Sequence, residues 1–338
     1  MNFHRQSGGL RLILTRTLRW LVASIGGVLL SRRNYNELLL QRERAVRELS
    51  ELETTHLRHG LTGIVLSKDR ALQLYALLQT YARFVKNPAA LFVIYNASNE
   101  SHAKAYVEVE AAFQSSALEL TFICEKDSFR ESLIDVLKRV DTRNIFFLVD
   151  DIIFIRPLNL DVAASIDPFR VILSFRHSPH LRRSYTSAVS QMPPNFSPAP
   201  DSQNLLVFNW FEKGNEWSDP WSLDGQVLST AEVRVLSRLS NFKAPNTYEA
   251  SLKSFGDIIM GRKGMCYEES KILNLPINRV QNEVENISGS VSPEFLLEQW
   301  NMGLMLDTSM FDTYEPSSTH EEHPVRFTRR GTVAQLEE

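Results

Sequence analysis

Short apolar stretches alternate with amphipathic helical patterns between residues 63 and 158, and this alternation limits the fold more than any other feature of the chain. Each of the first three stretches is followed by apolar side chains at helical spacing. The four predicted strands are 63–67, 90–96, 118–124 and 144–149. Strands and helices in this order form βαβ units, whose strands are parallel and whose crossovers are right-handed. The sequence therefore predicts an α/β fold with helices on the faces of a largely parallel sheet.

Polar side chains follow each of the four predicted strands. In open parallel sheets, ligands bind beyond the carboxyl ends of the strands, so these residues are the first candidates for a site. The candidates are Ser67, Lys68, Asp69, Arg70, Asn96, Ser98, Glu125, Asp150 and Asp151. No GxGxxG motif follows the first strand, and neither GxxxxGKS nor GxxxxGKT occurs in the chain. This argues against a dinucleotide-binding Rossmann domain and against a P-loop NTPase.

Asp150 and Asp151 are adjacent carboxylates at the end of an apolar strand. Two such carboxylates repel each other, which raises a pKa unless a cation lies nearby. Mg²⁺ or Mn²⁺ removes this conflict and bridges to a diphosphate, because both ions bind one or two carboxylates together with phosphate oxygens. An ion pair with Arg156, or a role in capping a turn, is the structural alternative that the sequence leaves open.

The segments GIVLSKDR, ALFVIYNAS, LELTFICE and FFLVDDIIFIRPL, in this order, resemble the nucleotide-sugar domain of bacterial GT-A glycosyltransferases. These enzymes belong to the nucleotide-diphospho-sugar transferase superfamily, and their acidic DxD motif ends the fourth strand. The resemblance covers roughly residues 61–282. It implies a Rossmann-like mixed sheet flanked by helices, a nucleotide-diphosphate sugar as donor and Mn²⁺ or Mg²⁺ as cofactor. Many members carry a further acid where this chain has Val149.

The resemblance also implies roles for the residues at the strand ends. Asp151 would bind the metal, and Asp150 would contact the metal or the ribose. The nucleotide-sugar contacts that it implies are Ser67, Arg70, Asn96 and Asp150. We add Arg279, from the segment NLPINRVQN, because a guanidinium suits the charge of a diphosphate leaving group.

Residues 61–158 are thus expected to bind the nucleotide sugar, and residues 159–305 to bind the acceptor, a glycan or a lipid-linked molecule. The segment 209–230 contains three tryptophans close to Asp219 and Asp224. Aromatic rings beside carboxylates are a common way to hold sugars, although the same tryptophans are equally consistent with a hydrophobic core. The predicted acceptor contacts are Trp221, Arg176 and His177.

Glu249 and Asp224 are the two candidates for a catalytic base. An inverting transfer needs one carboxylate near the acceptor hydroxyl, and burial can tune its pKa. Glu249 resembles the acidic residue that inverting GT-A enzymes place at the N-terminus of a helix. In the structural alternative, Asn246 caps that helix and Glu249 completes a capping box. A retaining enzyme needs no such base, so the stereochemistry is left open.

Residues 1–33 contain six arginines and no Lys, Asp or Glu. Their apolar run, 20–30, is shorter than the roughly 20 residues of a spanning helix. On a helical wheel the arginines and the apolar side chains separate, which predicts an amphipathic helix on an anionic membrane surface. We therefore expect a cytoplasmic enzyme bound peripherally to the inner face of the membrane. A core-docking helix and a short signal anchor are the alternatives.

Two further segments flank the predicted domain. Residues 34–57 contain neither Gly nor Pro and mix charges with leucines, so 34–60 is predicted to be a linker helix or a short coiled coil that joins copies of the chain. Residues 306–338 are predicted to form a flexible tail. In the alternative, His320 or His323 from this tail supplies a third metal ligand.

Composition excludes several classes of function. A net charge of −3 argues against a general nucleic-acid binder, and the two cysteines show no CxxC spacing for zinc. We predict a membrane-associated, metal-dependent glycosyltransferase that transfers a sugar from a nucleotide-diphosphate donor. One alternative is a sugar-nucleotide nucleotidyltransferase, which usually needs a Gly-rich basic loop that SKDRALQ lacks. The other is a non-catalytic membrane scaffold.

Overall fold

The computed structural model describes residues 32–125, 127–200, 204–280 and 289–331. The chain divides into two compact units, Met1–Glu48 and Leu49–Glu338. In the first unit, the described residues form the beginning of helix α2 (Arg32–Thr54), which runs on into the second unit. This helix occupies most of the segment in which the sequence predicts one. Most of the basic segment 1–33 lies outside the described residues.

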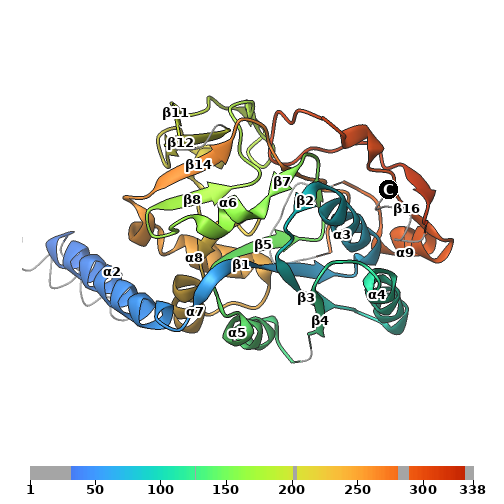
Figure 1. The fold of residues 1–338 in the computed structure, drawn as a ribbon, viewed down its shortest axis with the longest axis horizontal. Helices are drawn as coiled ribbons and strands as arrows, with labels where there is room; N and C mark the ends of the chain where they lie inside the picture. The colour runs from blue at the N-terminus through green and yellow to red at the C-terminus, as the bar shows by residue number, and fades with distance from the viewer. Residues whose placement is uncertain (1–31, 126, 201–203, 281–288, 332–338) are drawn as a thin grey trace, which may run out of the picture. The chain divides into compact units, whose positions relative to one another are not determined.

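The second unit is built around a mixed sheet, in which the described residues form nine strands (Figure 1). The strand order is β11-β12-β14-β8-β13-β5-β1-β3-β4. The four strands predicted from the sequence are its parallel half: β1 (Arg58–Lys68), β3 (Ala90–Asn96), β4 (Leu120–Cys124) and β5 (Thr142–Val149). All neighbours in this half pair in parallel. The predicted α/β class with a mixed sheet is therefore confirmed.

The other half of the sheet comes from later in the chain and contains antiparallel pairs. Its strands are β8 (Val171–Ser174), β11 (Ser197–Pro198), β12 (Leu205–Asn209), β13 (Gln226–Ser229) and β14 (Lys263–Tyr267). Strand β13 joins the halves because it pairs antiparallel with both β5 and β8. Among the described residues, four small strand pairs lie outside this sheet: β2 (Val85–Lys86) with β7 (Leu158–Asn159), β6 (Ile152–Phe154) with β15 (Ile272–Asn274), β9 (Arg183–Ser184) with β10 (Val189–Ser190), and β16 (Leu304–Leu306) with β17 (Phe327–Arg329).

Helices cover both faces of the sheet. The connections from β1 to β3 and from β3 to β4 run toward the β4 edge of the sheet, whereas the connection from β4 to β5 runs in the opposite direction, past β3 and β1. Right-handed crossovers therefore place α3 (Ala71–Phe84) and α4 (Glu100–Phe113) on one face and α5 (Phe129–Arg139) on the other. Helix α9 (Pro293–Asn301) packs on α3 and α4, and α7 (Thr230–Leu239) packs on α5. The remaining α-helices of the described second unit are α6 (Leu160–Ser165) and α8 (Pro245–Lys253).

Local sequence explains where these elements begin and how closely the strands pack. The side chains of Asn99 and Ser128 cap α4 and α5, each accepting a hydrogen bond from a backbone N–H one turn later. Gly63 lies in the middle of β1, where a Cβ atom would be 2.3 Å from Leu91 and 2.6 Å from Phe146. Glycine thus lets the neighbouring strands fill this part of the core with large side chains.

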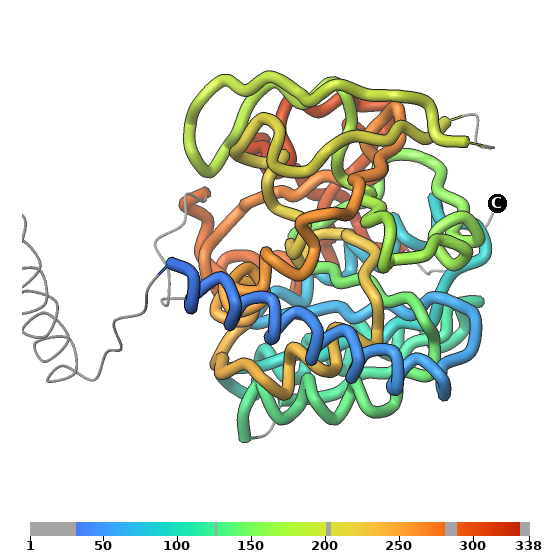
Figure 2. The backbone as a smooth tube through the Cα atoms, turned by 90° about the vertical axis from the view of Figure 1, so that its left-hand side faces the viewer, coloured from blue at the N-terminus to red at the C-terminus, as the bar shows by residue number. Residues whose placement is uncertain are grey.

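The C-terminal residues differ from the prediction of a flexible tail over 306–338. As far as residue 331 the segment packs against earlier parts of the second unit, and Figure 2 shows it in red beside the yellow-green loops near residue 182. The Thr319 side chain is buried and its hydroxyl donates a hydrogen bond to the Glu216 carboxylate at 2.8 Å. The backbone of His320 forms an isolated parallel β-bridge with Asn274 of β15. These contacts join residues about 45 to 100 positions apart, and hydrophobic periodicity does not reveal such polar contacts.

Candidate active site

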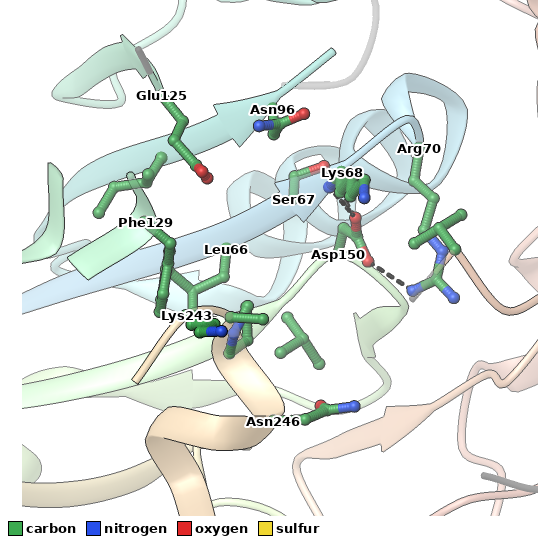
Figure 3. A pocket seen from close by; sticks show the side chains of 15 residues that line it. Leu66, Ser67, Lys68, Arg70, Asn96, Glu125, Phe129, Asp150, Lys243 and Asn246 are labelled. Carbon is green, nitrogen blue, oxygen red and sulfur yellow. Dashed lines mark hydrogen bonds and ion pairs between the residues drawn. The ribbon is translucent and has the colours of Figure 1, made fainter. Parts of the chain in front are cut away.

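Asp150 organises the carboxyl ends of β1 and β5, where the sequence places a ligand site. Its Oδ2 atom accepts hydrogen bonds from Ser67 Oγ at 2.8 Å and from the Lys68 backbone N–H at 3.1 Å. Its Oδ1 atom lies 2.8 Å from Arg70 Nη1, and the side chains of both partners are almost buried (Figure 3). Protein donors therefore occupy both oxygens of this carboxylate, which fixes the ends of the two strands relative to each other.

A cavity of about 290 Å³ opens beyond these strand ends, and we call it the strand-end pocket. Its apolar wall consists of Leu66, Ile94, Phe129, Val149, Ala244, Pro245 and Val280. Its polar residues are Ser67, Lys68, Arg70, Asn96, Glu125, Asp150, Lys243 and Asn246. Figure 3 shows Glu125 and Asn96 toward one end and Arg70 toward the other. The structure thus brings together four predicted nucleotide-sugar contacts, which are Ser67, Arg70, Asn96 and Asp150.

A second cavity, of about 390 Å³, adjoins the first, and we call it the acidic pocket. The two share Arg70, Val149, Pro245 and Asn246 as lining residues. The carboxylates of the acidic pocket are Asp151, Glu216, Asp219, Asp224 and Glu249, and its cations include Arg70, Arg176, Lys253 and Arg279. One predicted metal ligand, both predicted bases, one predicted acceptor contact and the predicted leaving-group residue therefore line one cavity: Asp151, Asp224, Glu249, Arg176 and Arg279.

Asp151 lines the acidic pocket next to the shared wall. Its Oδ2 atom lies 3.5 Å from Arg70 Nη1, and its Oδ1 atom accepts a hydrogen bond from Asn274 Nδ2 at 3.4 Å. Burial raises the pKa of Asp151 to about 7; Arg70 opposes this rise, while the carboxylates of Asp150 and Asp224 add to it. The charge of this carboxylate is therefore only partly compensated by the protein.

The geometry separates the two aspartates as candidate metal ligands. In the described part of the chain, no group of three or more His, Cys, Asp or Glu residues is placed to hold a metal ion. The expectation that Asp150 binds metal is not supported, because protein donors use both of its oxygens. Asp151 fits a divalent cation better, since such ions bind through one carboxylate when phosphate oxygens complete the coordination.

Glu249 projects from α8 into the acidic pocket. Its Oε1 atom lies 2.5 Å from Lys253 Nζ, and its Oε2 atom accepts a weak hydrogen bond from the Leu223 backbone N–H at 3.4 Å. Burial raises the pKa of Glu249 to about 7; Asp219 adds to this rise and Lys253 opposes it. A carboxylate with such a pKa suits general base catalysis near neutral pH.

The capping-box interpretation of Glu249 is wrong. Ala244, and not Asn246, is the N-cap of α8, and Pro245 is the first helical residue. The Thr247 hydroxyl accepts a hydrogen bond from the Ala244 backbone N–H at 2.9 Å, so Thr247 and not Glu249 occupies the third helical position of the cap. Proline at the first helical position needs no partner for a backbone N–H, so the start of α8 shifts by two residues.

Asp224, the other candidate base, is ion-paired. Its Oδ2 atom lies 2.7 Å from Arg176 Nη1, with both side chains largely buried, and 3.8 Å from His320 Nε2. Both candidates are ion-paired, since Glu249 contacts Lys253, so the choice rests on the pKa of Glu249, which burial raises to about 7 and which suits a base near neutral pH. Arg176, a predicted acceptor contact, lines the pocket, but its guanidinium is already ion-paired with Asp224. Arg279 lines the same pocket from an exposed position.

His177 and Trp221 do not lie where an acceptor could reach them. Trp221 is 1% exposed and His177 is fully buried, with Nε2 2.9 Å from the Glu216 carbonyl and Nδ1 2.7 Å from Ser174 Oγ. Burial lowers the pKa of His177 to about 3, so its ring is neutral. The imidazole packs on Trp210 and Trp217 in an aromatic cluster. The hydrophobic-core interpretation of the tryptophans is therefore correct.

Replacing Trp217 by alanine is expected to lower the free energy of unfolding by about 3–5 kcal/mol, because the indole is fully buried in this cluster. Chemical denaturation measures the change, with exposed Met192→Ala as the control. If the Trp217→Ala protein is as stable as the wild type and loses sugar binding, the tryptophans bind the acceptor sugar after all.

Several pocket residues are not among the site residues that the sequence predicts. They are Phe129, Lys243, Lys253, Asn274 and Asn278. Lys253 follows Glu249 by one helical turn, and this spacing was a usable signal. Asn274 and Asn278 belong to a segment without periodicity, where no signal distinguishes a site residue from an ordinary loop residue.

The raised pKa values predict a pH-dependent cost to stability. Between the ordinary carboxyl pKa near 4 and the folded value of about 7, the folded state of Asp151 or Glu249 binds more protons than the unfolded state. Stability is therefore lost as the pH rises through 7. In EDTA at pH 8, Asp151→Asn and Glu249→Gln are expected to melt about 2 °C or more above the wild type, with a smaller difference at pH 5. Lower melting temperatures at pH 8 would contradict these shifts.

Comparison with known proteins finds similarity to a glycosyltransferase. The chain is 26% identical over 193 residues to the bifunctional glycosyltransferase pgtA of Dictyostelium discoideum, a match that covers 52% of this chain and 24% of the relative. The chain thus spans about a quarter of that protein. This match confirms the resemblance to glycosyltransferases that the strand segments and their ends indicate. No protein-family model matches the chain.

Two solved structures illustrate how distant the structural relatives are. S. aureus TarS 1–349 in complex with UDP-GlcNAc is 13% identical, with a TM-score of 0.42, and the match covers 70% of this chain and 63% of that one. The 4-diphosphocytidyl-2C-methyl-D-erythritol synthase of Anaerococcus prevotii is 12% identical, with a TM-score of 0.35 and a coverage of 62% and 88%.

Proposed function

We propose that this protein transfers a sugar from a nucleotide-diphosphate donor to a glycan or lipid-linked acceptor. The observation that carries the proposal is the pair of adjoining pockets at the strand ends. One pocket has apolar walls and polar ends suited to a nucleoside, and the other holds Asp151 and Glu249 in one cavity. The sequence similarity to a glycosyltransferase supports it.

The residues of the acidic pocket have separate roles in the proposed reaction. Asp151 would hold Mn²⁺ or Mg²⁺, which supplies positive charge to the donor diphosphate when bound. Arg279 would add a guanidinium to the same phosphates. Glu249 would take the proton of the acceptor hydroxyl. The hydroxyl oxygen would then attack the anomeric carbon of the donor sugar, while the bond from that carbon to the diphosphate breaks. The nucleoside diphosphate then leaves.

Arg70 and Asp150 shape this site without reacting. The Arg70 guanidinium pairs with Asp150, lies 3.5 Å from Asp151 and also donates to the Asn278 carbonyl oxygen. It therefore connects the strand ends, the predicted metal ligand and the loop after β15. We assign both residues to positioning, with Asp150 also next to the place of the ribose.

A panel of nucleotide sugars tests the proposal. Binding is measured by calorimetry for UDP- and GDP-sugars, each with Mn²⁺ and with EDTA. We expect at least one donor to bind more tightly with Mn²⁺, and its sugar to be transferred or slowly hydrolysed with release of nucleoside diphosphate. Release of pyrophosphate from a nucleoside triphosphate and a sugar phosphate would instead indicate a nucleotidyltransferase. Absence of any nucleotide binding would favour a scaffold.

Membrane attachment through residues 1–33 is a further part of the proposal. The charge pattern of this segment supports it, and the structure does not describe residues 1–31. In the described ranges, no helix is both long and apolar enough to cross a bilayer. Flotation with anionic liposomes should be lost when residues 1–33 are removed. Equal flotation of both proteins would refute attachment through this segment.

Self-association through residues 34–57 is supported by side chains of α2. The leucines of this helix that are about half or more exposed are Leu38, Leu40, Leu49 and Leu52, and exposed apolar side chains on a helix are available to a second copy of the chain. Light scattering of the full chain should show a dimer that Leu49→Lys weakens. A monomer at all concentrations would contradict it.

A further inference from the structure

Two buried asparagines in the acidic pocket each have one polar atom without a partner. Asn274 is 1% exposed and Asn278 is 2% exposed, and both line the pocket. Among the described residues, neither Asn274 Oδ1 nor Asn278 Nδ2 has a hydrogen-bond partner. A buried polar atom without a hydrogen-bond partner is unfavourable for the folded protein. When its side chain lines a cavity, a bound ligand can supply the missing hydrogen bond.

The other half of each amide is held by the protein, which fixes both side chains. Asn274 Nδ2 donates to Asp151 Oδ1 at 3.4 Å, and Asn278 Oδ1 accepts from Gln73 Nε2 at 2.8 Å. The Asn278 carbonyl oxygen accepts from Arg70, which lines both pockets. The free acceptor therefore belongs to a side chain that contacts Asp151. The free donor belongs to Asn278, whose backbone is held by Arg70, and Arg70 itself lies 3.5 Å from Asp151.

The free acceptor, Asn274 Oδ1, and the free donor, Asn278 Nδ2, can both be satisfied by hydroxyl groups. A sugar hydroxyl both donates and accepts hydrogen bonds, so hydroxyls satisfy the Oδ1 atom of one asparagine and the Nδ2 atom of the other. Of the pocket cations, Arg70, Arg176 and Lys253 already pair with carboxylates. The remaining one, Arg279, is the residue that we assign to the donor phosphates. Asn274 and Asn278 themselves carry no charge, and Asp151 is nearby. This part of the pocket suits an uncharged sugar and disfavours a sugar acid.

We propose that Asn274 and Asn278 bind hydroxyl groups of a neutral donor sugar and so determine which sugar is transferred. This inference rests on the proposed function. Asn274 contacts Asp151 directly and Asn278 is linked to it through Arg70. This places both at the donor sugar, since a cation on Asp151 would hold the diphosphate to which that sugar is joined. The acceptor, in contrast, would approach Glu249.

The test compares affinities for a nucleotide sugar and for the bare nucleoside diphosphate. Calorimetry with the full chain and Mn²⁺ uses UDP and GDP as bare probes, with UDP-glucose, UDP-galactose, UDP-N-acetylglucosamine, UDP-glucuronate and GDP-mannose. In the wild type, at least one neutral sugar should increase affinity over its bare nucleotide, and glucuronate should not. Asn274→Leu and Asn278→Leu should each reduce that increase about 3- to 10-fold, the equivalent of one hydrogen bond.

Controls separate a sugar contact from a structural role. Asn195→Leu changes an exposed asparagine outside both pockets and should leave every affinity unchanged. A purely structural role would change the melting temperature and weaken the bare nucleotide as much as the nucleotide sugar. If a leucine variant does not fold, the alanine variant replaces it, and affinity for the bare nucleotide shows that the site is intact.

Three results would overturn the inference. Both leucine variants could keep the full increase in affinity from the sugar, or UDP-glucuronate could bind more tightly than every neutral donor. In both cases nucleotide binding persists, so the proposed function survives. If the wild type binds neither nucleotides nor nucleotide sugars, the proposed function fails and the inference fails with it.

Discussion

Replacement of Asp151 by asparagine is expected to abolish the metal-dependent part of donor binding and to lower the rate of sugar transfer about 10²- to 10³-fold. The carboxylate is the best-placed metal ligand among the described residues, because it lines the acidic pocket and its charge is met only by the Arg70 guanidinium at 3.5 Å, which Asp150 shares, and by one weak hydrogen bond. Asparagine keeps the size of the side chain and the contact with Asn274 but offers a cation only a neutral oxygen.

The experiment measures donor affinity as a function of Mn²⁺ for the wild type and for Asp151→Asn. Asp135→Asn, an exposed change on α5, is the control and should behave like the wild type. The melting temperature of Asp151→Asn, which is expected to exceed that of the wild type at pH 8, is measured alongside and separates a loss of binding from unfolding. Unchanged dependence on Mn²⁺ in Asp151→Asn would exclude this residue as the metal ligand.

Glu249→Gln is expected to reduce transfer about 10²- to 10⁴-fold, the usual contribution of a general base, while donor affinity stays close to that of the wild type. The wild-type rate should rise with pH through about 7, since Glu249 must lose its proton before it can accept one from the acceptor hydroxyl. The residual rate of the variant should lack this rise. Saturating Mn²⁺ and donor keep Asp151 ionised during the measurement.

Asp224→Asn is the matched comparison for Glu249→Gln, because both residues line the acidic pocket and both were candidate bases. The Arg176 pair makes Asp224 a structural carboxylate, so Asp224→Asn should lower stability and keep the pH dependence of the rate. If Asp224→Asn removes the rise with pH and Glu249→Gln preserves it, the two assignments must be exchanged.

The parallel half of the fold was predictable because its signal is local. The segments 63–67, 90–96, 118–124 and 144–149 each lie within or overlap an observed strand, and helical periodicity identified the crossovers. The strand-end residues followed from a general rule about parallel sheets, which brought Ser67, Asn96, Asp150 and Asp151 to one edge without knowledge of any contact.

The remaining features depend on contacts between distant parts of the chain. The pairing of Asp150 with Arg70 spans 80 residues, and this contact decides which aspartate is available to a metal. The tryptophan cluster around His177 has the composition of a sugar site and the burial of a core, and only the structure distinguishes the two. Asn274 and Asn278 enter the site because β15 pairs with β6, which follows Asp151 directly.

In the proposed function, the two adjoining pockets bind a nucleotide-diphosphate sugar with the diphosphate at Asp151. A crystal structure with Mn²⁺ and the tightest nucleoside diphosphate of the binding panel tests this most directly, since the anomalous signal of manganese locates the ion. We predict the nucleoside in the strand-end pocket, and the ion within coordination distance of Asp151 and the phosphates but not of Asp150. A nucleotide bound elsewhere, or manganese held by other residues, would contradict the account.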